Sequence, residues 1–115
     1  MLKDKLLDPA SAVLLYGTTP PRAASTPDAV RAAADKLAAR LAPLPLDGVV
    51  VYDIQDESGR TDKPRPFAFT GTVDPRSYSA LLAARTGKPA ITYQCVGNLD
   101  ESAWRAWLDA AASDH

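Results

Sequence analysis

The stretch that decides the fold covers residues 47–60 and reads DGVVVYDIQDESGR. Gly48 precedes three consecutive valines, and a polar run begins after them at Tyr52. A continuous β-branched run between turn residues is typical of a strand buried on both faces, as in parallel sheets that helices cover. Polar residues after such a strand lie at its carboxyl end, where ligands bind in parallel α/β folds. The stretch therefore predicts a central strand with a candidate ligand site at its end.

Similar units lie on both sides of this strand. Apolar runs of strand length occur before and after it, and proline-containing helix starts such as Thr26-Pro27 and Asp74-Pro75 follow the first two strands. A short helix at residues 2–7 comes first. This order of elements predicts an α/β fold with a parallel sheet of βα units. The expected strands cover residues 12–16, 48–51 and 89–93, and the expected helices cover about 27–41, 75–86 and 99–113, the last opened by a capping box at 98–101.

The composition excludes several classes of function. A chain of 115 residues with 46% hydrophobic residues suits one domain, and a net charge of −1 gives no basic surface for nucleic acid or anionic membranes. Apolar runs stay well short of the roughly 20 residues that cross a bilayer. The single Cys95 and the absence of a secretory cleavage site predict a cytoplasmic protein. With its single histidine at position 115, the chain is expected to hold no metal.

The polar ends of the three strands hold the candidate binding residues. They share a position just beyond a strand, where a ligand would be bound. The alternatives stay open: the charges of the second strand end could pair with one another in a solvated loop, and Tyr93 could belong to the core. Cys95 is expected to be a small buried residue. The candidates are Arg22 after the first strand, Tyr52, Asp53, Gln55, Asp56, Glu57 and Arg60 after the second, and Tyr93 and Gln94 after the third.

The same strand ends read YGTTPPR at 16–22, YDIQDESGR at 52–60 and TYQCVGN at 92–98. In these motifs the chain resembles the first three βα units of the flavin-dependent methylenetetrahydrofolate reductase family. The resemblance implies that residues 1–115 form a single partial domain, the N-terminal part of a TIM (β/α)₈ barrel. It also implies an oxidoreductase of folate one-carbon metabolism, which uses FAD and NAD(P)H.

The resemblance also implies roles for the candidate residues. Where the family has a glutamate as general acid, this chain has Gly17, and where the family has a flavin-contacting histidine, it has Thr92. No catalytic residue is therefore assigned. The implied FAD contacts are Tyr52, Asp53, Gln55, Arg60, Tyr93 and Gln94, and the implied substrate contacts are Arg22, Asp56 and Glu57.

A second hypothesis is a non-catalytic protein. Three βα units cannot close an eight-stranded barrel, and they would leave open sheet edges. The alternative is thus a diverged or truncated barrel relative that binds a small ligand or forms a homo-oligomer through those edges. Trp104 and Trp107, three residues apart on the last helix, are expected to pack or to drive self-association.

Overall fold

The computed structural model describes residues 1–55, 59, 62–63 and 70–114. The three strands form one parallel sheet in the order β1-β2-β3. This confirms the predicted α/β class with a parallel sheet, and within the described residues the sheet is open rather than closed. The elements are α1 (Leu2–Leu7), β1 (Leu15–Thr18), α2 (Pro27–Leu41), β2 (Gly48–Val51), α3 (Pro75–Thr86), β3 (Ala90–Thr92), a 3-10 turn η1 (Val96–Asn98) and α4 (Glu101–Asp114).

The central strand is β2, as residues 47–60 predict. All four of its residues are buried. Val50 pairs with Gly17 of β1 and with Ile91 of β3, so both neighbours run alongside it in register. Because side chains alternate along a strand, Val49 and Val51 point to one face and Val50 to the other. The two faces of the sheet are therefore covered by different side chains of β2.

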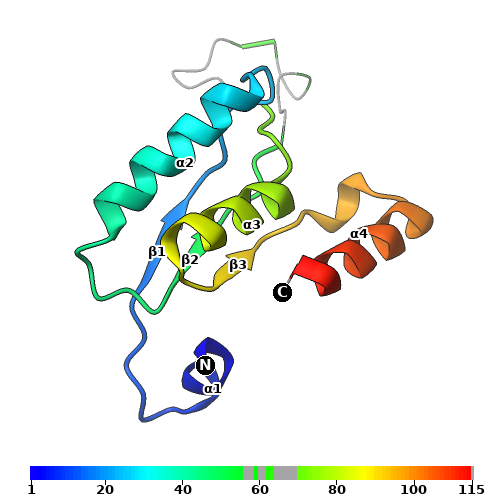
Figure 1. Ribbon diagram of the computed structural model, residues 1–115. Helices are drawn as coiled ribbons and strands as arrows, with labels where there is room; N and C mark the ends of the chain where they lie inside the picture. Colours follow the sequence, from blue (N-terminus) through cyan, green and yellow to red (C-terminus); the bar gives the residue numbers. More distant parts are fainter. Residues whose placement is uncertain (56–58, 60–61, 64–69, 115) are drawn as a thin grey trace.

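Helices α2 and α3 cover the same face of the sheet (Figure 1). Their N-termini are capped as expected: the Thr26 hydroxyl accepts a hydrogen bond from the N–H of Ala29 at 3.2 Å, and the Asp74 carboxylate accepts from the N–H of Arg76 at 3.1 Å. Gly87 ends α3 with a φ of 68°, a left-handed conformation that glycine adopts without strain. The core lies between these helices and the sheet, and its buried members are Ala34, Leu41, Val49, Val51, Tyr78 and Leu82.

The bounds of two strands differ from the prediction. The first strand was expected at residues 12–16 but covers Leu15–Thr18. Leu15 pairs with Gly48, the first residue of β2, so residues before Leu15 have no neighbouring strand to pair with. The N–H of Leu14 instead donates to the Asp47 carboxylate at 2.8 Å. The third strand is likewise shorter than 89–93 and covers Ala90–Thr92.

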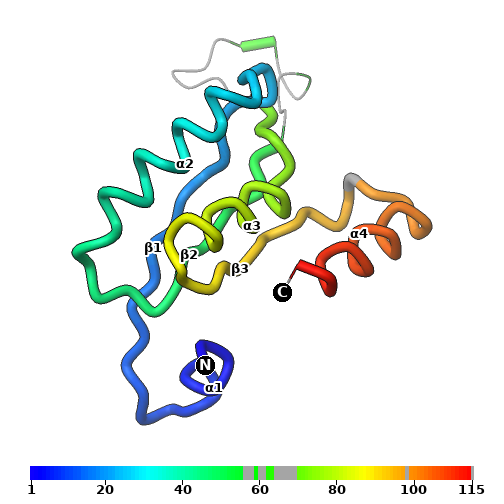
Figure 2. The backbone as a smooth tube through the Cα atoms, in the orientation of Figure 1, coloured from blue at the N-terminus to red at the C-terminus, as the bar shows by residue number. Residues whose placement is uncertain are grey.

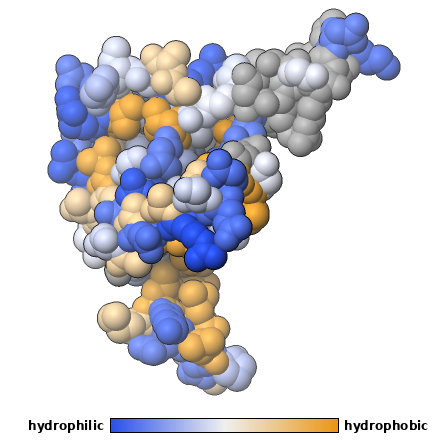
Figure 3. All heavy atoms as spheres, turned by 90° about the vertical axis from the view of Figure 1, so that its right-hand side faces the viewer, coloured by the Kyte–Doolittle hydropathy of each residue, from blue (hydrophilic) through white to orange (hydrophobic). Residues whose placement is uncertain are grey.

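Helix α1 lies against the face of the sheet opposite α2 and α3, at the amino end of the strands. A Cβ on Gly48 would lie 3.0 Å from Cδ2 of Leu2, and Lys5 Nζ donates to Asp47 Oδ1 at 2.6 Å. Figure 3 shows apolar side chains gathered at the lower end of the molecule, where α1 lies. The N-terminal segment therefore closes only the amino end of this face.

Helix α4 stands apart from the sheet (Figure 2). It has no buried residue, and an ion pair between Arg76 and Asp114 ties its end to α3. The predicted cap at Asn98 is wrong: residues 96–98 form η1, and Asp100 accepts from the N–H of Ala103 at 2.7 Å. Trp104 and Trp107 stack on each other with ring centroids 5.2 Å apart. In the part of the chain that the structure describes, no helix is both long and apolar enough to span a bilayer.

Candidate functional site

A cavity of about 650 Å³ opens beyond the carboxyl ends of β2 and β3. These strands are parallel neighbours, so the residues that follow them emerge at the same edge of the sheet. Four residues predicted from the sequence as ligand contacts meet here. The lining residues are Tyr52, Asp53, Ile54, Tyr93, Gln94 and Cys95.

Tyr52 and Tyr93 pack against each other in this cavity, and we call this pair the aromatic corner. Their backbones continue the sheet ladder: the N–H of Tyr52 donates to Thr18 O, and the N–H of Tyr93 donates to Val51 O, each at 2.9 Å. Their ring centroids are 5.4 Å apart and their planes meet at 81°, the edge-to-face geometry that aromatic pairs prefer. Tyr52 is 39% exposed and Tyr93 is 53% exposed. Both rings are thus fixed at the backbone and open to a ligand.

Asp53 joins the two strand ends. Its Oδ2 accepts a hydrogen bond from the N–H of Cys95 at 2.7 Å. A charged acceptor makes this bond stronger than one between neutral groups. One carboxylate oxygen therefore braces the loop after β3, and Asp53 shapes the cavity whether or not it contacts a ligand.

The expectation that Cys95 is buried is wrong. The cysteine is exposed and free, and it lines the cavity. Because β3 ends at Thr92, Cys95 lies on the loop beyond the sheet. Ile54 was also missed as a lining residue. The sequence signal for Ile54 and Cys95 is their position, three residues past a strand end, next to the polar residues that were predicted as ligand contacts.

The other predicted contacts lie elsewhere. Gln55 is half-buried next to the lining residue Ile54 but is not itself part of the lining. Arg22 is exposed and forms an isolated antiparallel bridge with Thr72, which holds the β1–α2 loop to the segment before α3. The predicted contacts Asp56, Glu57 and Arg60 lie outside the described residues.

The two positions where the reductase family carries functional side chains are used differently here. Gly17 has no side chain, and the Tyr52 ring occupies the space that a Cβ there would need. The Thr92 hydroxyl donates to the Ser79 Oγ at 2.7 Å, so this side chain points to α3 rather than into the cavity. Neither position therefore supplies a side chain to the cavity. Among the described residues, no cluster of histidine, cysteine and acidic side chains is arranged to hold a metal ion.

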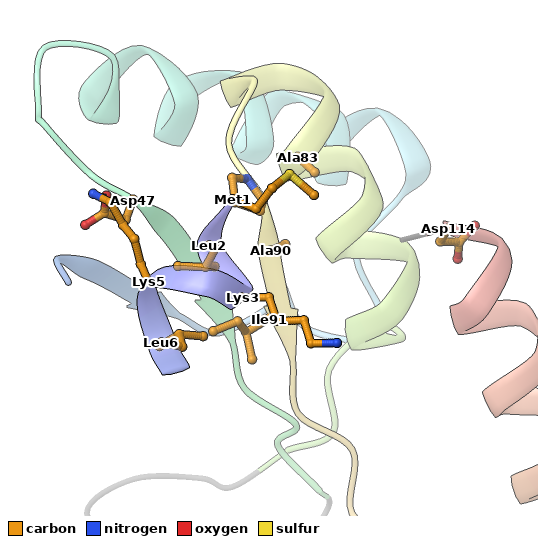
Figure 4. Close-up of a pocket in the computed structure, with 11 residues that line it drawn as sticks. Met1, Leu2, Lys3, Lys5, Leu6, Asp47, Ala83, Ala90, Ile91 and Asp114 are labelled. Atoms are coloured by element: carbon orange, nitrogen blue, oxygen red, sulfur yellow. The ribbon is translucent and has the colours of Figure 1, made fainter. Parts of the chain in front are cut away.

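A second cavity, of about 710 Å³, lies near the amino ends of the strands (Figure 4). Leu2 and Leu6 of α1 form one wall, and Ala90 and Ile91 of β3 form the other. It is larger than the carboxyl-end cavity, but its walls are mostly apolar and depend on a helix of six residues. In βα folds this end of the sheet serves stability, whereas ligands bind at the carboxyl end. We therefore take the carboxyl-end cavity as the candidate site.

No protein-family model and no curated protein matches the sequence. Among solved structures, the chain is similar to an uncharacterized protein from Clostridium thermocellum that binds two copies of 5-methyl-5,6,7,8-tetrahydrofolic acid. The two share 31% sequence identity and superpose with a TM-score of 0.74 over 93% of the present chain. The chain spans 33% of the length of that protein. The similarity thus relates nearly all of this chain to about a third of a longer folate-binding one.

Proposed function

We propose that this domain binds a reduced folate in the cavity beyond β2 and β3. The observation that carries the proposal is the aromatic corner at the carboxyl end of a parallel sheet. The similar structure supports it, because that protein binds a methylated tetrahydrofolate at 31% identity. The bound molecule would be a small one, since the cavity of about 650 Å³ is within the size range of small-molecule sites.

The chemistry of the cavity suits the head of a folate. A pterin is flat and carries hydrogen-bond donors and acceptors along its edge. Tyr93, more than half exposed, offers a ring face for stacking, and the Gln94 side chain can both donate and accept hydrogen bonds. The folate tail is anionic, and Arg22 on the β1–α2 loop carries a positive charge that we propose as its partner. A guanidinium can hold a carboxylate by two parallel hydrogen bonds.

The arrangement of the three βα units also bears on the larger fold to which they would belong. We propose that the three βα units correspond to the N-terminal part of a (β/α)₈ barrel, in which the face bearing Val50 and Tyr52 would look inward. The parallel order β1-β2-β3 and the helices α2 and α3 on a single face agree with such a barrel.

Reductase activity with FAD and NAD(P)H stays a prediction from the sequence resemblance. The geometry at Gly17 and Thr92 favours binding without reduction, because neither position supplies a proton donor or a flavin contact to the cavity. Adding FAD to the purified protein tests the prediction. A flavin that co-purifies or saturates the protein would support the reductase, and a protein that stays colourless and binds no added FAD would exclude it.

Folate binding is tested by titrating 5-methyltetrahydrofolate into the protein and measuring heat or fluorescence. We expect saturable binding by the wild type. Tyr93→Ala should weaken it by roughly two- to tenfold, because a stacking aromatic contact is worth about 0.5–1.5 kcal/mol beyond its buried area. Tyr16→Ala is the matched control, since Tyr16 is 39% exposed and lies in β1 outside the cavity lining. Absence of saturable binding by the wild type would refute the proposed function.

A further inference from the structure

We propose that Gly17 and Tyr52 act as a pair that sets the position of the Tyr52 hydroxyl beside the folate cavity, where it hydrogen-bonds the ring of the ligand. This inference rests on the proposed function and specifies the residue that would orient the folate. It starts from a close approach between two neighbouring strands.

The glycine is required by the tyrosine and not by its own backbone. Gly17 lacks the positive φ that favours glycine at Gly87. However, a Cβ built on Gly17 would lie 2.8 Å from Cε2 and 2.9 Å from Cζ of Tyr52, with the hydroxyl oxygen closer still. Carbon atoms that are not bonded make their best contact at about 3.5–4.0 Å. Any side chain at position 17 would therefore displace the Tyr52 ring.

The position of the Tyr52 backbone is set by the sheet. Tyr52 directly follows Val51, which pairs with Thr18, and its N–H donates to Thr18 O at 2.9 Å. From this position the Tyr52 ring extends over β1, and the β1 residue beneath it on the same face of the sheet is Gly17. On its other side, the ring meets Tyr93 edge to face. The hydroxyl thus lies where the first side-chain atom of residue 17 would otherwise be.

The Tyr52 side chain, which comes from the end of β2, thus occupies the space that a side chain at position 17 of β1 would fill. A phenol hydroxyl donates one hydrogen bond and accepts others, so it can pair with the donor and acceptor groups of a pterin edge. A flat ring that stacks on Tyr93 would stand nearly perpendicular to the Tyr52 ring, because the two tyrosine planes meet at 81°. Tyr52 is therefore a positioning residue for the ligand, and Gly17 makes its position available.

The experiment measures 5-methyltetrahydrofolate affinity for four variants of the full chain. Tyr52→Phe should weaken binding by roughly three- to tenfold, the value of one hydrogen bond, while Tyr16→Phe leaves it unchanged. Gly17→Ala should weaken binding because it displaces the ring, while Gly97→Ala should not, since a Cβ there meets nothing within 4 Å. The NMR shifts of the Tyr52 ring should change in Gly17→Ala and stay the same in Gly97→Ala.

A double variant makes the coupling explicit. Once Tyr52→Ala has removed the ring, adding Gly17→Ala should cost no further affinity. If the wild type binds folate but Tyr52→Phe binds equally well, or if Gly17→Ala leaves ring shifts and affinity unchanged, the inference is wrong and the proposed function stands. If the wild type binds no folate, both the inference and the proposed function fail.

Discussion

Three glycines of this chain show how one residue type serves different physical needs. Gly87 is used for its left-handed backbone at the end of α3. Gly17 and Gly48 are used for close approach, the first by the Tyr52 ring and the second by the backbone of Pro89. Gly97 meets neither condition, since its surroundings are open. The difference predicts which of these positions tolerate a methyl group.

Gly48→Ala should destabilise the protein. A Cβ there would lie 2.9 Å from the carbonyl oxygen of Pro89 and 3.0 Å from Leu2 Cδ2, and the carbonyl belongs to the sheet ladder and cannot move freely. Overpacking of this kind costs about 1–3 kcal/mol of unfolding free energy. Chemical denaturation of Gly48→Ala, with Gly97→Ala as the control variant, measures this loss of stability. A Gly48→Ala protein as stable as Gly97→Ala would contradict the close approach.

At the scale of elements, the Asp47 side chain links α1 to the start of β2. A helix of six residues is not stable alone. Asp47 holds the segment by accepting hydrogen bonds from Lys5 Nζ at 2.6 Å and from the N–H of Leu14 at 2.8 Å. The hydrogen bond from Lys5 and then that from Leu14 lower the pKa of the Asp47 carboxyl below its ordinary value of 3.8. The charged form therefore stabilises the docked segment.

This gives a pH dependence with a definite sign. Since the pKa of Asp47 is lower in the folded state, its contribution to stability is complete above the ordinary value of 3.8 and is lost as the pH falls through the folded pKa. The protection factors of the amides in residues 2–7, which are exchange rates corrected for their intrinsic pH dependence, should be the same at neutral pH and at pH 5 and should fall in acid.

Two asparagine variants separate the groups that titrate in this range. Asp47→Asn should lower the protection of the α1 amides at every pH. Asp8 also has a lowered pKa, because Ser11 and the N–H of Ala10 donate to it, but these bonds are local and do not reach the sheet. Asp8→Asn should therefore leave the acid-induced loosening of α1 in place. Loss of the effect in Asp8→Asn, with Asp47→Asn unaffected, would show that the tether was assigned to the wrong residue.

At the scale of the whole molecule, the described sheet has two outer strands. Within the described residues, β1 and β3 each pair on one side, so their other sides present backbone groups that can pair with another chain. Helix α4 adds a surface with no buried residue and with two stacked tryptophans. We propose that these features let the chain self-associate.

Sedimentation over roughly a hundredfold range of protein concentration tests self-association, because its extent depends on concentration. We expect the mean mass to rise with concentration. Tyr16→Lys on the edge strand β1 should lower it, since lysine on an edge opposes pairing. Leu44→Lys is the control, because Leu44 is 43% exposed in the loop after α2. A monomer at every concentration, or equal effects of the two lysines, would rule out edge pairing.

Local rules explain which parts of this fold could be predicted from the sequence. The valine run fixed β2, and the capping residues Thr26 and Asp74 with their prolines fixed the starts of α2 and α3. These signals act within a few residues, so the chain alone carries them. The meeting of Tyr52, Asp53, Tyr93 and Gln94 also follows from the sequence, because parallel strands end at one edge of a sheet.

Only the tertiary structure decided what depends on contacts between distant residues. The start of β1 at Leu15 is set by pairing with β2, the exposure of Cys95 by where β3 ends, and the role of Gly17 by the ring of Tyr52. In residues 47–60, the sequence itself determined a buried strand with a polar end. The structure decided that Tyr52 at this end fills the place of the missing side chain on β1, because register and the crossing of a ring over a neighbouring strand are properties of packing and not of composition.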